Sequence, residues 1–134
     1  MKFKMAFFVL LVFIGVIYSA YGNESEINSC IQFIKSYGWE VLPNPTERVD
    51  VTIPKVFDRV YENYNELQKS AGLDLMPYRS KSGVRYSFVV TNYPEYTGET
   101  VYANIILIDG KAIAGDIMTV SLNGFMHALN KYSP

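Results

Sequence analysis

Apolar and polar residues recur along the chain with two different periods, and the period predicts each element. Between residues 27 and 37 the apolar residues return every three or four positions, which is typical of one face of a helix. Asn23 and Glu26 have the spacing of an N-terminal capping box, and Gly38 is suited to end the helix. The apolar face would consist of Ile27, Cys30, Ile31, Ile34 and Tyr37.

A strand and a second helix are expected next. Residues 48–53 alternate between polar and apolar types, which predicts a strand. Pro54 suits the first turn of a helix, and Gly72 would end that helix. On a helical wheel its apolar arc contains Gln68 as the single polar exception. The arc is formed by Val56, Phe57, Val60, Tyr61, Tyr64, Leu67, Gln68 and Ala71.

The second half of the chain shows mainly the two-residue period of β-structure. Segments 75–79 and 84–93 flank a turn at 80–83 and are expected to form a hairpin. Segments 100–108 and 111–120 flank Asp109-Gly110, which is a strong hairpin signal. From Ser121 onward, apolar residues at helical spacing predict a final helix over 121–130.

These elements predict a single α+β domain over residues 23–134, in the order α-β-α-β-β-β-β-α. The sheet would be mostly antiparallel, with about four to five strands and the helices packed on one face. An exported chain with a single cysteine has no internal disulfide, but a domain of this length can be stabilised by its core alone.

The first 22 residues resemble an export signal. Lys2 and Lys4 precede a continuous apolar run over 5–18, and Ala20 and Gly22 form the small-x-small pattern of a cleavage site. We expect either a signal peptide cleaved after Gly22 or an uncleaved signal anchor. Both place the rest of the chain outside the cytoplasm, as a secreted protein or one anchored to the outer face of the cytoplasmic membrane. Contact with the membrane would then involve only an uncleaved N-terminal segment.

The balance of acidic and basic residues restricts the class of partner that the protein can bind. The chain has 12 basic and 13 acidic residues, and two of the basic ones lie in the signal segment. The remaining acidic excess argues against nucleic acid, which requires a basic surface. The partner would be an unknown protein, peptide or envelope component.

Four stretches, residues 38–41, 53–75, 85–94 and 101–129, carry a resemblance to known sequences. They resemble a small bacterial family catalogued only as domain-of-unknown-function family 4830, seen mainly in Firmicutes. The resemblance implies a signal or anchor at the N-terminus and no assigned activity. At 114–116 the chain has Ala-Gly-Asp where Gly-Gly-Asp is expected, and at 127–129 it has His-Ala-Leu where His-Gly-Leu is expected.

The expected hairpin register places Ala103 opposite Asp116. Asn92 and Asp116 then become the polar exceptions on the core face of the sheet, and Gln68 is the exception on the helix above it. A buried carboxylate needs hydrogen-bond donors, so we expect Gln68, Asn92 and Asp116 to form one cluster, with His127 a further possible donor. The cluster is interpreted as structural, with a binding or catalytic site as the alternative.

Other chemistry has weaker support. Cys30 and His127 are a nucleophile and a base by type, but Cys30 lies within an apolar stripe, where an inert core thiol is the usual case. No spacing of metal ligands is present, and no cofactor is implied. We therefore predict an exported, non-enzymatic binding module with no assigned catalytic residue. The alternative is a small hydrolase-like enzyme that uses Asp116 and His127.

Overall fold

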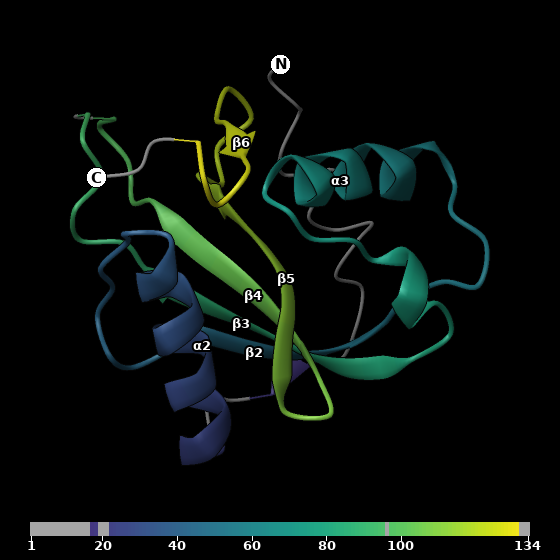
Figure 1. Ribbon diagram of the computed structural model, residues 1–134. Coiled ribbons are helices and arrows are strands. Elements are labelled where there is room, and N and C mark those ends of the chain that lie inside the picture. The colour runs from purple at the N-terminus through teal and green to yellow at the C-terminus, as the bar shows by residue number, and fades with distance from the viewer. Residues whose placement is uncertain (1–16, 19–21, 96, 132–134) are drawn as a thin grey trace.

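An antiparallel sheet forms the centre of the protein (Figure 1). The computed structural model describes residues 17–18, 22–95 and 97–131. Within these residues the strands lie side by side in chain order, and each pairs antiparallel with the next. The elements are β1 (Ile17–Tyr18), α2 (Glu24–Ser36), β2 (Glu47–Thr52), α3 (Arg59–Ser70), a 3-10 turn (Met76–Tyr78), β3 (Ser82–Val89), β4 (Tyr102–Ile108), β5 (Lys111–Met118) and β6 (Met126–His127).

The predicted α+β class is confirmed, and so are the principal local signals. The Asn23 side chain caps α2 by accepting hydrogen bonds from the backbone N–H groups of Ser25 and Glu26. Gly38 follows the helix with a φ of 90°, a conformation that favours glycine. The turn between β4 and β5 has positive φ at both Asp109 and Gly110, which joins the strands tightly and preserves their twist.

Helices α2 and α3 lie on opposite faces of the sheet, and not on one face as expected (Figure 1). Cys30 and Ile34 of α2 pack in one apolar cluster with Tyr86 and Ile105 of the sheet. Tyr64 of α3 packs in the other cluster, with residues that point to the opposite side of the strands. Side chains on both faces of β3, β4 and β5 are therefore buried.

A β-bulge in β5 changes the expected pairing. Ile108 pairs with Lys111 as predicted, but Ile106 pairs with Ala114, so Ile113 is the extra residue. An extra residue moves every later side chain to the other face of the strand. Asp116 consequently pairs with Asn104 and not with Ala103.

Three local predictions are wrong. Helix α3 begins at Arg59 with Asp58 as its cap, because the Asp58 carboxylate accepts from the N–H of Tyr61. Segment 75–79 is a 3-10 turn and not a strand, which agrees with the presence of Pro77. The tail forms a turn and β6 in place of a helix, and β6 pairs with Ile117 and Met118.

Most of the predicted export signal lies outside the described residues. Of that segment the structure describes β1, which pairs with β2 at the edge of the sheet, and Gly22. In the described part of the chain, no helix is both long enough and apolar enough to cross a membrane.

Candidate functional site

Gln68 is fully buried on α3 and binds the backbone of β5. Its amide nitrogen donates to the carbonyl of Gly115 and its amide oxygen accepts from the Gly115 N–H, each at 2.9 Å. Strand β6 pairs with β5 only at Ile117 and Met118, so the outer edge of β5 needs another partner at Gly115. Gln68 supplies this partner, which explains why a polar residue lies on the apolar face of the helix.

Asn92 is separate from Gln68. Its side chain donates to the carbonyl of Gly38 at 3.1 Å and accepts from the N–H of Glu40 at 2.8 Å. These bonds hold the segment after α2 against the end of β3. The predicted cluster of Gln68, Asn92 and Asp116 is therefore wrong, because the three side chains bind three different partners.

Asp116 lies at the centre of a different polar network. It is completely buried, and its carboxylate accepts from the Tyr64 hydroxyl at 2.6 Å and from the Asn104 amide at 3.0 Å. Burial raises the pKa of Asp116 to about 6, although the two hydrogen bonds and the positive charge of Arg85 oppose the shift. The pKa of Tyr64 is raised well above its usual value, mainly by burial, so its hydroxyl stays protonated and donates.

The network continues across the sheet toward the surface. Asn104 accepts from Ser87 at 2.6 Å and from Arg85 at 3.2 Å. Arg85 also donates to Ser87 and forms an ion pair with Glu47. A cavity of about 290 Å³ opens beside Arg85, Ser87 and Glu47. The buried network thus reaches a polar opening at one end.

The sequence analysis missed most of this network because the expected register placed Asp116 opposite Ala103, on the other face of the sheet from Asn104. Tyr64 of α3 lies on the Asn104 side of the sheet, where its hydroxyl donates to Asp116. One available signal was the hydroxyl of Tyr64, because a tyrosine on a buried helix face usually needs a polar partner. The other was the row of polar residues on adjacent strands, but the bulge in β5 hid the match with Asp116.

His127 faces away from Asp116. It pairs with Ile117, the next residue of β5, so its side chain shares the face of Ile117 and not that of Asp116. Its Nδ1 donates to the carbonyl of Ala128 at 2.8 Å, which leaves Nε2 to accept from the Tyr93 hydroxyl at 2.8 Å. Burial lowers the pKa of His127 and favours the neutral ring. Asp116 and His127 therefore do not form an acid–base pair in this structure.

The His127 ring belongs to an aromatic stack. It lies nearly parallel to the ring of Phe125, with 5.5 Å between centroids and an interplanar angle of 4°. Trp39 stacks on Tyr93 at 5.6 Å and donates through its indole nitrogen to the carbonyl of Leu129 at 2.6 Å. This packing fixes the C-terminal segment against the body of the protein.

Cys30 is fully buried between α2 and the sheet. Burial, with a smaller effect from the negative charge of Glu26, raises the pKa of its thiol to about 12. The reactive thiolate is therefore scarce at neutral pH, as expected for an inert core cysteine. Among the described residues, no group of three or more His, Cys, Asp or Glu side chains is placed to hold a metal ion.

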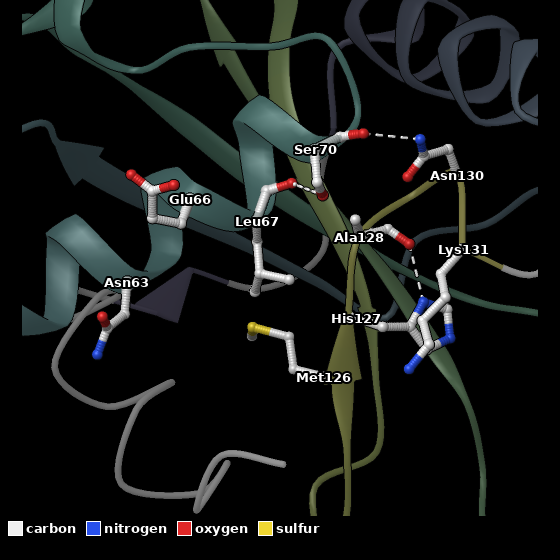
Figure 2. Close-up of a pocket in the computed structure, with 9 residues that line it drawn as sticks. All are labelled: Asn63, Glu66, Leu67, Ser70, Met126, His127, Ala128, Asn130 and Lys131. Carbon is white, nitrogen blue, oxygen red and sulfur yellow. Dashed lines mark hydrogen bonds between the residues drawn. The ribbon is translucent and has the colours of Figure 1, made fainter. Parts of the chain in front are cut away.

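A groove lies between α3 and the C-terminal segment, with a volume of about 640 Å³ (Figure 2). Leu67 and Met126 point toward one another across its apolar floor, and Asn130 closes one end by donating to the carbonyl of Ser70 at 2.8 Å. Polar side chains form the rim above this floor. The lining residues are Asn63, Glu66, Leu67, Ser70, Met126, His127, Ala128, Asn130 and Lys131.

In the described residues, an antiparallel meander with α2 on one face and α3 on the other, a buried polar network and an amphipathic groove defines a small α+β domain. The chain belongs to the family described as "Domain of unknown function (DUF4830)", whose family model matches residues 33–117. No curated protein and no solved structure matches the chain.

Proposed function

We propose that the protein is an exported, non-enzymatic module that binds a protein, peptide or envelope component through the groove between α3 and the C-terminal segment. The groove carries the proposal. An apolar floor of Leu67, Met126 and Ala128 under a polar rim suits a partner that inserts an apolar side chain and presents polar groups around it. Glu66 and Lys131 on the rim would orient the partner by charge.

Two further observations support the proposal. Asn23 caps α2, and it is the residue at which cleavage after Gly22 would place the new N-terminus. The polar residues that suggested catalysis instead have structural partners, as described for Gln68, Asp116 and His127. The resemblance to a family seen mainly in Firmicutes favours a bacterium of that group as the source.

Photo-crosslinking in the native host would test the groove. A crosslinking amino acid at Asn63 or at Glu66, both on the rim, should capture the same envelope partner. The matched control is the same amino acid at Lys35, an exposed position near the end of α2 on the other side of the sheet. Equal capture from Lys35, or no capture from either rim position, would contradict a specific groove ligand.

Mass spectrometry of the secreted and envelope fractions would test export. We expect a mature chain that begins at Asn23. Recovery of the intact chain, embedded in the membrane, would exclude cleavage but leave the extracytoplasmic location standing. Recovery from the cytoplasm would contradict export.

A further inference from the structure

The outer edge of β2 has few strand partners among the described residues. On its inner side β2 pairs with β3 along its full length. On its outer side, the described pairing is limited to β1, with Ile17 opposite Val49 and Tyr18 opposite Arg48. Helix α2 packs mainly over β4 and β5 and contacts β2 through Glu26, which lies 3.9 Å from Arg48, while α3 packs over β5 (Figure 1). The edge of β2 is therefore able to pair with an added antiparallel strand, and residues of the precursor already do so.

Cleavage after Gly22 would remove β1 together with the signal segment. The backbone N–H and C=O groups of β2 that face outward would then lack their strand partner. An open strand edge of this kind pairs readily with another extended segment. The question is which segment complements β2.

The sequence of β2 is complementary to itself. Antiparallel pairing with a second copy, centred on Val49, places Val49 opposite Val49 and Arg48 opposite Asp50 on both sides of the centre. Arg48 and Asp50 already attract each other within one chain, with 3.7 Å between Nη1 and Oδ1. The Asp50 side chain is 54% exposed and is free to turn toward a partner strand. Opposite charges placed directly across two strands stabilise the pair.

The two neighbouring symmetric registers are less favourable. Pairing centred on Arg48 places two arginines opposite each other, and pairing centred on Asp50 does the same with two aspartates. Both arrangements place like charges across the strands, which is destabilising. Among the registers centred on residues 48, 49 and 50, the charge pattern of β2 therefore favours the one centred on Val49.

We propose that the mature protein forms a dimer by antiparallel pairing of β2 with β2 of a second copy, centred on Val49, so that one sheet runs through both copies. This inference rests on the proposed removal of residues 1–22. It deepens the proposed function by assigning a second copy of the chain to one surface, while the groove beside α3 stays open to another partner.

Charge-reversal variants of residues 23–134 would test the dimer by sedimentation equilibrium over a range of concentrations. Asp50→Arg and Arg48→Asp each place like charges opposite each other, so the dissociation constant of each homodimer should rise at least about tenfold. An equal mixture of the two variants restores opposite charges at both positions and should form a heterodimer about as strong as the wild-type dimer. Glu62→Arg, an exposed charge reversal on α3, is the matched control and should leave dimerisation unchanged.

Arg48 also contacts Tyr86 and Glu26, with 3.3 Å from Nε to the Tyr86 hydroxyl, so Arg48→Asp could affect folding as well. A cysteine test avoids this residue. In a Cys30→Ala background, Val49→Cys should form an intermolecular disulfide with oxidised glutathione, since paired Cα atoms of adjacent strands are within disulfide range. Glu62→Cys in the same background should not.

A wild-type 23–134 chain that stays monomeric at all concentrations, or a mixture of the two charge variants that does not associate, would overturn the dimer. Either result leaves the export proposal intact, because export is judged by the N-terminus found in cells. Conversely, a chain that keeps residues 1–22 in cells would refute processing, while the recombinant 23–134 chain would still test the strand pairing.

Discussion

The side chain of Gln68 on α3 makes both available backbone hydrogen bonds of Gly115 on β5, one in each direction at 2.9 Å. It takes the place that a neighbouring strand would occupy. An added Cβ at Gly115 would come within 2.6 Å of the Asn104 carbonyl oxygen, so the backbone here is also tightly enclosed. This contact fixes the position of α3 along the strand, and with it the position of Tyr64 over Asp116.

Gln68→Ala should therefore destabilise the protein strongly. It leaves a buried N–H and a buried C=O without a partner, which costs on the order of 2–4 kcal/mol. Urea denaturation would measure the loss. Lys69→Ala at the next position removes a side chain that is 51% exposed and should change stability by less than about 0.5 kcal/mol. Similar losses for the two variants would show that the Gln68 contact has little energetic importance.

Stability should depend on the protonation of Asp116. Its pKa is raised from 3.8 to about 6 in the folded protein, so the folded state favours the protonated carboxyl. The contribution of this carboxyl group to the free energy of unfolding is fully present below about pH 4 and is lost as the pH rises through about 6. Asp116→Asn removes this titrating group, so the variant should not show the loss. As the pH rises from about 4 to about 7, the free energy of unfolding of the variant should therefore increase relative to that of wild type by on the order of 3 kcal/mol.

Urea denaturation of wild type and Asp116→Asn at several pH values would check this. Tyr64→Phe provides a companion measurement, because loss of the donated hydrogen bond should raise the Asp116 pKa further and move the loss of stability to higher pH. A difference between wild type and Asp116→Asn that is constant with pH would show that Asp116 titrates normally.

Cys30 should react slowly with thiol reagents in the native protein and quickly in the unfolded one. Its thiol is buried and its pKa is raised to about 12, so both access and thiolate are limited. Cys30→Ala should fold and lose about 1–2 kcal/mol of packing. The rate of labelling with and without denaturant is the measurement. Rapid labelling of the folded protein would mean that α2 separates readily from the sheet.

Asn92→Ala should cost less than Gln68→Ala, about 1 kcal/mol. It removes two bonds to the backbone of Gly38 and Glu40, but these groups lie near the surface, where water can replace the side chain. Thermal denaturation of the two variants side by side would rank them. A greater loss for Asn92→Ala would show that the segment after α2 is more important to stability than the contact of α3 with β5.

The sequence by itself determined those features that depend on neighbouring residues. Asn23 and Gly38 bound the first helix because a side-chain acceptor and a positive φ are needed there. Asp109-Gly110 joins β4 and β5 for the same kind of local reason. The α+β class followed from these elements, and the membership of the unknown-function family followed from the resemblance of the segments that contain them.

Only the tertiary structure decided which residues meet. The bulge at Ile113 cannot be read from the pattern, because apolar residues lie on both sides of it and both registers bury them. That single extra residue turned Asp116 toward Asn104 and Tyr64 and away from His127. Tyr64 of α3 then donates to Asp116 on that face. The polar side chains there can be buried because they hydrogen-bond to one another.

The C-terminal segment illustrates the same limit. Its apolar spacing fits a helix, yet Met126 and His127 form a strand because the backbone of β5 at Ile117 and Met118 needs hydrogen-bond partners. That requirement arises from an edge formed elsewhere in the chain. Local pattern determined most elements of this protein, and long-range backbone hydrogen bonding determined this last strand, the faces of the sheet, the polar network and the groove.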